Sequence, residues 1–405
     1  MTSSNLTRGA ATWALLSLAV GSFGIGMTEF VVMGLLPDIG QDLLPSLWAL
    51  RSEDAIAQAG WLISLYALGV VIGAPTIAGA VAKYPRRRVM IGLALALTVF
   101  NALTFLAPTF EWVAASRFLA GLPHGAYFGI GALVAAEVLG PGMRAKGVAF
   151  VLTGLTVANV VGVPLGTFIG QQVGWRAAFM IVAAIFLAAT VLIALFVPED
   201  EGDPSRTMRA ELKVFRIGQV WLALAVGAIG FGGFFAVYSY VAPMVTDVAG
   251  SPEWAVPIVL VLMGIGMTIG NLVGGHLADV DLRRTLVGGL IGLAVVLALV
   301  GATAQWIWAL ALFVFATGFV SSVLSPTIQT RLMDVAQDNQ SIAAALNHSA
   351  LNIGNSLGAF LGGLVIAAGW GFVAPAWVGV VLALAGLAIA AASLVTERRR
   401  MPAGV

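Results

Sequence analysis

Apolar segments of about twenty residues recur along the whole chain, and each is long enough to cross a hydrocarbon core of about 30 Å as a helix. Of the 405 residues, 60% are hydrophobic and only 10% are charged. Soluble domains run near 45–50% apolar and about 25% charged, and a soluble fold cannot bury so large an apolar excess. The sequence therefore predicts an all-α membrane protein, with the lipid bilayer as its surroundings and no nucleic-acid partner.

Twelve such segments are predicted, with links that are mostly short. They cover residues 13–36, 59–81, 89–107, 112–138, 147–172, 176–197, 218–241, 256–277, 285–304, 306–328, 341–367 and 373–395. Lys and Arg collect in cytoplasmic loops of membrane proteins. With the amino terminus inside, 17 of the 20 Lys and Arg residues fall on the cytoplasmic side. We therefore expect both termini to be cytoplasmic.

The longest charged stretch divides the twelve segments into two sets of six. It predicts an N-terminal six-helix bundle at 1–197, a cytoplasmic linker at 198–217 and a C-terminal six-helix bundle at 218–405. Two short repeats favour a duplication. Gly79-Ala-Val-Ala-Lys83 with Arg87-Arg88 matches Gly275-His-Leu-Ala-Asp279 with Arg283-Arg284, and Gly166-Thr-Phe-Ile-Gly170 matches Gly358-Ala-Phe-Leu-Gly362.

Motifs for other chemistries are absent from the sequence. There is no cysteine, no phosphate-binding G-x-x-x-x-G-K-[ST] loop and no H-E-x-x-H metal pair. We therefore expect no enzyme activity, no metal and no cofactor.

Charges inside the apolar segments are the strongest functional signal. Glu29 lies about seven residues, roughly 10 Å, from the predicted outer end of its segment, and Arg117 lies at a similar depth. An ionisable group at such depth costs about 2.5–3.5 kcal/mol unless it is paired, neutral or in a wet cavity. His124 follows Arg117 by seven positions and shares its helix face. Glu29, Arg117 and His124 are thus candidates for proton coupling; a permanent ion pair and hydrogen bonds between helices are the structural alternatives.

Polar and aromatic side chains in other segments are candidates for a substrate cavity. His348, Asn352 and Asn355 share one helix face, and Phe231, Phe234 and Tyr238 belong to an aromatic face. Helix packing is the alternative role for each of them. The full candidate set is Ser22, Met33, Phe128, Asn159, Phe231, Phe234, Tyr238, His348, Asn352 and Asn355.

Three motifs resemble those of the major facilitator superfamily. The loop from Gly79 to Arg88 is similar to its loop signature, with Lys83 where an acid is usual, and Arg117-Phe-Leu-Ala-Gly121 is similar to its proton-transfer motif. The antiporter motif is similar to the stretch that contains Gly154, Gly162, Pro164 and Gly166, with Val163 splitting the usual Gly-Pro pair. Gly26-Met-Thr-Glu-Phe-Val-Val-Met-Gly34 and Gly121-Leu-Pro-His-Gly125 narrow the resemblance to twelve-span drug:proton antiporters of the arabinose-efflux and chloramphenicol-exporter group.

The resemblance implies alternating access by two bundles around a midplane site, with a cytoplasmic gate. The gate candidates are Arg87, Arg88, Glu137, Asp279, Arg283 and Arg284. Glu137 lies close in depth to Arg86–Arg88, so we expect a gate pair there. The implied function is proton-coupled export of a small neutral or amphipathic molecule, such as a drug like chloramphenicol or a sugar. The resemblance also implies a monomer in a bacterial cytoplasmic (inner) membrane. A sugar or nucleoside facilitator or symporter on the same fold is the alternative; a polytopic membrane enzyme is more remote, and a channel lacks a filter-like segment.

Overall fold

The computed structural model describes residues 8–81, 83–140, 144–200, 202, 216–336 and 340–400, and these contain helices and no strands. By contacts the chain divides into two compact units, one of Met1–Ala210 with Val256–Val261 and one of Glu211–Ala255 with Leu262–Val405. The predicted division at 197 and 218 stays a prediction, and most of the predicted linker lies outside the described residues.

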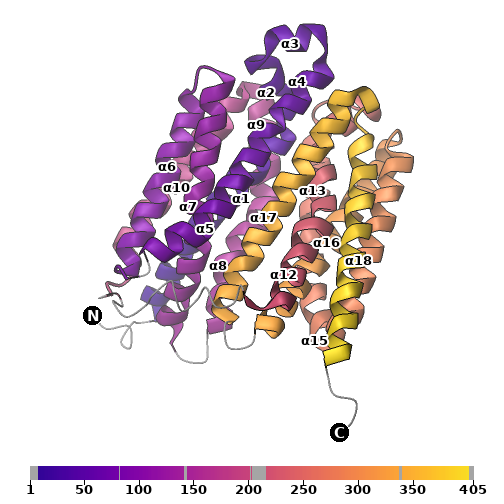
Figure 1. Ribbon diagram of the computed structural model, residues 1–405. Helices are drawn as coiled ribbons and strands as arrows, with labels where there is room; N and C mark the ends of the chain where they lie inside the picture. The colour runs from indigo at the N-terminus through magenta and orange to yellow at the C-terminus, as the bar shows by residue number, and fades with distance from the viewer. Residues whose placement is uncertain are drawn as a thin grey trace. The chain divides into compact units, whose positions relative to one another are not determined.

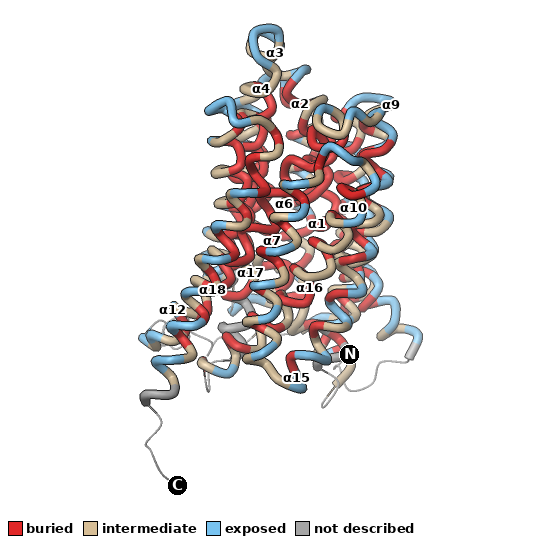
Figure 2. The backbone as a smooth tube through the Cα atoms, turned by 90° about the vertical axis from the view of Figure 1, so that its right-hand side faces the viewer, coloured by how far each residue is buried: buried red, intermediate tan, exposed pale blue. Residues whose placement is uncertain are grey.

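The first unit is built from long apolar helices joined by short turns (Figure 1). Its elements are α1 (Arg8–Gly34), α2 (Leu36–Leu43), α3 (Pro45–Leu50), α4 (Ser52–Ala59), α5 (Trp61–Val81), α6 (Arg86–Leu106), α7 (Phe110–Leu139), α8 (Arg144–Val157), the π-helical turn η2 (Ala158–Gly162), α9 (Val163–Val173) and α10 (Trp175–Phe196). Figure 2 shows long buried stretches of α1 and α7, the two helices that carry Glu29 and Arg117.

The second unit has the same kind of construction, with more interrupted helices. Its elements are α12 (Gly218–Ala225), η4 (Val226–Gly230), α13 (Gly232–Tyr238), α14 (Val241–Pro243), η5 (Met244–Val248), α15 (Ala255–Thr303), α16 (Ile307–Ala336), α17 (Gln340–Val365), η7 (Ile366–Trp370) and α18 (Ala374–Arg400).

Each of the twelve predicted apolar segments falls mostly on helical residues. Within the described ranges, eleven helices are long and apolar enough to cross a membrane. One of them, α15, has 49 residues and covers two predicted segments, and its backbone is extended at Asp281 (φ −156°, ψ 93°). A single span needs only about 20 residues, so α15 has the length for two.

Glycines allow α5 and α7 to pack backbone against backbone. A Cβ added at Gly121 would collide with the Tyr66 carbonyl oxygen, and one at Gly69 would collide with the Phe118 carbonyl oxygen. In lipid, helices associate through such close van der Waals contact, because burying apolar surface gives no net gain there. This contact fixes α7, which carries Arg117, against α5.

We expect Gly121→Val to lower the thermal stability of the detergent-purified protein. The new side chain would force the two backbones apart, at a cost of about 1–3 kcal/mol. Gly129→Val on the same helix is the matched control, because a Cβ there meets nothing within 4 Å. Thermal unfolding measures both variants; equal unfolding temperatures for the two would contradict the close contact.

Candidate functional site

A buried arginine lies at the centre of the first unit. Arg117 on α7 is fully buried, and its Nη1 donates to Thr28 Oγ1 of α1 at 2.9 Å. Its guanidinium carbon lies 4.2 Å from the ring centre of Tyr66 on α5 and 5.5 Å from that of Phe179 on α10. Its Nε and Nη2 have no hydrogen-bond partner among the described residues. Each unsatisfied buried donor costs about 1–3 kcal/mol, so this guanidinium has capacity for a further acceptor.

Glu29 lies within electrostatic range of this arginine. It is only 6% exposed, it is the residue after Thr28 on α1, and its charge acts on both Arg117 and Tyr66. The similar depths inferred from sequence therefore correspond to proximity in space. A role of Glu29 in proton coupling stays a prediction.

His124 joins the same cluster through a residue that sequence analysis did not single out. Its Nδ1 lies 3.0 Å from the Tyr66 hydroxyl, with either group able to donate, and its ring meets that of Phe128 edge-on at 5.3 Å. Tyr66 thus contacts Arg117 with its ring face and His124 with its hydroxyl. The three coupling candidates share one buried polar cluster.

The antiporter motif packs against the helix that carries Glu29. A Cβ at Gly154 would collide with the Ala19 carbonyl oxygen of α1, and Cβ atoms at Gly162 and Gly166 would lie 2.8 and 3.0 Å from Met27. The amide of Val163, which follows Gly162, donates to the carbonyl of Ala158 five residues earlier. Pro164 has no amide hydrogen to donate, and a single π-helical turn precedes it. The motif glycines thus bring α1 close to α8, η2 and α9.

The substrate-cavity candidates of the first unit are all buried. Ser22 and Met33 are fully buried, and the Ser22 hydroxyl donates to the Leu18 carbonyl of its own helix at 3.2 Å. Asn159 donates to Leu155 O at 3.1 Å, while its Oδ1 has no partner among the described residues. These residues stay candidates for ligand contact.

The aromatic candidates of the second unit form one cluster. Phe231 and Phe234 have ring centres 5.4 Å apart, and Phe234 and Tyr238 have theirs 5.3 Å apart. On α17, Asn352 Nδ2 donates to the His348 carbonyl at 3.0 Å, and Asn355 is fully buried. Phe231 directly precedes α13, which carries Phe234 and Tyr238, and the polar set lies on α17; α13 and α17 pack against each other within this unit.

Arginines at the start of α6 form ion pairs with acids of the first unit, and these contacts include two of its gate candidates, Arg87 and Glu137. Arg86 forms an ion pair with Glu137, whereas Arg87 Nη1 donates to Glu199 at 2.7 Å. The backbone amides of Arg86 and Arg87 donate to the Asp200 carboxylate at 2.8 and 3.1 Å. Glu137 therefore pairs with Arg86, one of the three arginines expected at its depth, and Arg88 is exposed.

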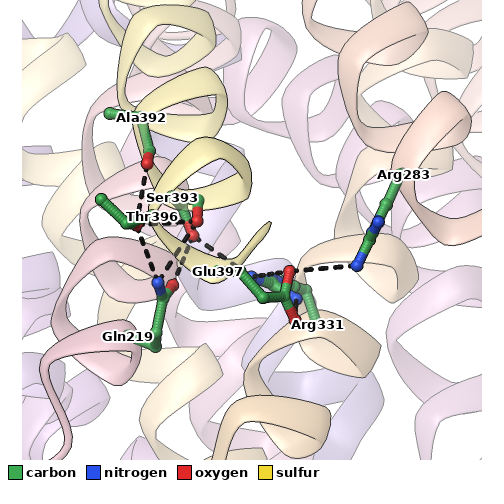
Figure 3. Close-up of polar contacts among 7 residues, drawn as sticks. All are labelled: Gln219, Arg283, Arg331, Ala392, Ser393, Thr396 and Glu397. Atoms are coloured by element: carbon green, nitrogen blue, oxygen red, sulfur yellow. Dashed lines mark hydrogen bonds and ion pairs between the residues drawn. The ribbon is translucent and has the colours of Figure 1, made fainter. Parts of the chain in front are cut away.

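A corresponding network ties together four helices of the second unit (Figure 3). Glu397 of α18 binds Arg331 of α16 at 3.1 Å and Arg283 of α15 at 3.3 Å. Ser393, one turn earlier on α18, donates to Gln219 Oε1 of α12 at 2.7 Å and accepts from Arg331 at 3.3 Å. Within this unit the network connects α12, α15, α16 and α18.

The remaining gate candidates of this unit lie beside that network. Arg284 pairs with Asp281 at 3.2 Å, three residues before it, and Asp279 is exposed. Among the gate candidates of this unit, Arg283 thus forms an ion pair with another helix. Its partner is Glu397 of α18, which the sequence motifs did not indicate.

We expect Glu397→Gln to destabilise the second unit. The amide keeps the shape of the side chain but removes the negative charge that binds Arg331. Because Arg331 is only 6% exposed, we expect the free energy of unfolding to fall by about 1–3 kcal/mol. Glu199→Gln is the matched control: the Glu199 side chain is 80% exposed, so its ion pair contributes below about 1 kcal/mol. Thermal unfolding of both variants checks this prediction. An equal loss of unfolding temperature in the two variants would contradict a larger contribution from the partly buried Glu397–Arg331 ion pair.

An acid on α2 fixes the short helices that follow α1, a segment for which the sequence predicts no element. The Asp42 carboxylate accepts from Trp175 Nε1 at 3.0 Å and pairs with Arg176, whose Nη2 donates to Ala107 O at 3.1 Å. Gly174 allows this turn, because it adopts φ +106° directly before Trp175. Partial burial by itself would raise the pKa of Asp42, but the hydrogen bonds from Arg176 and Trp175 and the Arg176 charge lower it below 3.8.

A lowered pKa predicts pH-dependent stability at this contact. Because the folded state holds the Asp42 carboxylate more readily than the unfolded state, the stabilisation is present above pH 3.8 and is lost as the pH falls through the lowered value. We expect wild type to unfold at a higher temperature than Asp42→Asn at neutral pH, with the difference shrinking below pH 3.8. A difference that is the same at all pH values would contradict this.

Sequence analysis missed several of these partners. Thr28 and Tyr66 lie within predicted apolar segments, and their polarity was the available signal. Glu199 and Glu397 follow the sixth segment of each half, so the internal repeat could have pointed to Glu397.

Comparison with known proteins shows where this architecture belongs. The family model of the Major Facilitator Superfamily matches residues 18–280 and 255–404. The inner membrane transport protein YdhP of Escherichia coli K12 is 36% identical over 360 residues, 89% of this chain and 90% of that protein. A chloramphenicol resistance protein of Streptomyces lividans is 31% identical over 387 residues, 93% of this chain and 94% of that protein. The crystal structure of a D-xylose-proton symporter superposes with a TM-score of 0.72 at 16% identity, covering 93% of this chain and 97% of that one.

The chain belongs to the major facilitator superfamily of membrane transporters, with its all-helical fold. The resemblance to the arabinose-efflux and chloramphenicol-exporter group is confirmed. The protein is a multi-pass transporter of the bacterial inner membrane, not an enzyme.

Proposed function

We propose that this protein is a proton-coupled exporter of a small neutral or amphipathic molecule. It would work by alternating access of two six-helix bundles, with twelve membrane crossings, both termini cytoplasmic and one copy as the working unit. The observation that carries the proposal is the buried cluster in which Glu29, an acid in a membrane helix, lies within electrostatic range of the fully buried Arg117. The similarity to a chloramphenicol resistance protein supports export of drug-like molecules.

The physical basis of coupling is competition between an arginine and a proton for one carboxyl group. Near a guanidinium the carboxylate is favoured, and a dry setting favours the protonated form. A cycle that changes the distance or the solvent access between Glu29 and Arg117 would load and release a proton. Each proton that moves inward supplies about 2.3 kcal/mol per 100 mV of membrane potential.

Reconstituted vesicles with an imposed pH gradient test this function. A thermal-shift screen of purified protein first selects compounds from chloramphenicol, D-xylose and uridine that raise its unfolding temperature. We expect a selected compound to accumulate in the compartment from which protons leave, and its addition to start opposite proton movement. Compound flux without proton flux would contradict the proposal.

A symporter or facilitator for a sugar or nucleoside is the second candidate. Val163 separates Gly162 from Pro164, and this split of the antiporter motif is the observation that favours it. The same vesicles decide the question, because a symporter moves protons and compound in the same direction and a facilitator moves no protons.

A further inference from the structure

A chain of hydrogen bonds leads from Arg117 through Thr28 to Asn101, and each residue donates to the next. On α6, Asn101 Nδ2 donates to the Leu97 carbonyl at 2.8 Å, which turns its Oδ1 toward α1. The Thr28 hydroxyl donates to that Oδ1 at 2.6 Å. Since a hydroxyl has one hydrogen to donate, Thr28 Oγ1 meets Arg117 as an acceptor, and Arg117 Nη1 donates to it at 2.9 Å.

This arrangement holds the guanidinium at one nitrogen, Nη1. Tyr66 covers its face at 4.2 Å, Phe179 lies at 5.5 Å, and Thr28 binds Nη1. Thr28, Asn101 and Arg117 are all fully buried, so water competes little for these bonds. The orientation of the guanidinium plane is therefore fixed by residues of four other helices: Thr28 of α1, Tyr66 of α5, Asn101 of α6 and Phe179 of α10.

Because Nη1 is bound, the edge formed by Nε and Nη2 is available for a further acceptor. Nε and Nη2, the two nitrogens without a partner among the described residues, form the side edge of the guanidinium. Two parallel N–H groups on one edge match the two oxygens of a carboxylate. The other edge, Nη1 with Nη2, also has two parallel N–H groups, but its Nη1 is already bound to Thr28 Oγ1. The Nε–Nη2 edge is therefore the edge on which neither nitrogen has a partner among the described residues.

We infer that Thr28 and Asn101 are positioning residues for Arg117, which keep its Nε–Nη2 edge turned to receive a carboxylate. This inference rests on the proposed function, in which Arg117 and a proton compete for one carboxyl group. The carboxylate comes from Glu29 in another state of the cycle or from a bound ligand.

Nitrogen-15 NMR of arginine-labelled protein tests the positioning without any transport. The Arg117 signals are identified by their loss in Arg117→Lys. A held guanidinium gives separate Nη1 and Nη2 resonances, whereas a freely rotating one gives a single averaged resonance. We expect separate resonances in wild type and Thr28→Ser, and averaged ones in Thr28→Val and Asn101→Leu.

Thr104→Val is the matched control for loss of a buried hydroxyl. Thr104 is a buried threonine of α6 that bonds Ser116 of α7 at 2.8 Å, outside the Thr28–Asn101 pair. It should keep the separate Arg117 resonances and show a similar unfolding temperature to Thr28→Val. Separate resonances in both Thr28→Val and Asn101→Leu, or averaging in Thr104→Val, would overturn the positioning role.

The source of the carboxylate is read from the Nε–H resonance of Arg117. A change in Glu29→Gln identifies Glu29, and a change when benzoate is added to wild type identifies a soluble carboxylate. If neither changes the resonance, the edge does not receive a carboxylate. Because this readout requires no transport, it can succeed while coupled transport by the protein fails, so the inference and the proposed function can be rejected separately.

Discussion

Replacing Glu29 by Gln is expected to abolish accumulation against a gradient while leaving the fold intact. The amide preserves size and hydrogen bonding, but it cannot bind and release a proton near pH 7. At 100 mV one coupled proton supplies about 2.3 kcal/mol, which supports a concentration ratio of about 50. We expect this ratio to fall to one in Glu29→Gln vesicles, measured as uptake of a selected compound.

Exchange without a gradient provides the control for the same variant. Counterflow of labelled against unlabelled compound requires no net proton movement, so it should continue in Glu29→Gln. Uphill uptake at the wild-type level would show that another group carries the proton, and loss of counterflow together with an unchanged unfolding temperature would point to substrate contact instead.

Removing Arg117 is expected to impair transport more broadly. Arg117→Ala deletes the cation near Glu29 and the group that packs between Tyr66 and Phe179. Mutations of this kind in buried charged clusters cost about 3–5 kcal/mol. We therefore expect a loss of more than tenfold in both gradient-driven uptake and counterflow.

Arg117→Lys separates charge from shape. Lysine keeps the positive charge but is a compact point donor without the planar fork. We expect it to restore counterflow in part and gradient-driven uptake little. Arg51→Ala is the control, since the Arg51 side chain is 53% exposed and pairs only with Asp54 among the described residues. Wild-type rates in Arg117→Ala would contradict a functional role for the cluster.

The apolar pattern predicted the helices well, because bilayer thickness sets one length for every span. Depth along a helix also placed Glu29 and Arg117 at a common level, and the structure brings them together. Residue spacing on one helix cannot show which partner on another helix is met. Tyr66, Thr28 and Asn101 were missed for this reason. Depth alone did place Glu137 near Arg86–Arg88, and the structure selects Arg86 as its partner.

Short helices outside the apolar segments were the other omission. Residues of α2, α3 and α4 have mixed composition, and Asp42 gains its role only because Trp175 and Arg176 lie beside it in the fold. The twelve crossings, the orientation and the substrate remain predictions.

The backbone contact between α5 and α7 provides a fixed reference for measuring movement. Two helices that touch at Gly69 and Gly121 have no space to slide past one another. Spectroscopic labels placed on both should therefore keep a constant separation throughout the transport cycle. Any change in distance from that pair to a label on α1 would then report displacement of the segment that carries Glu29.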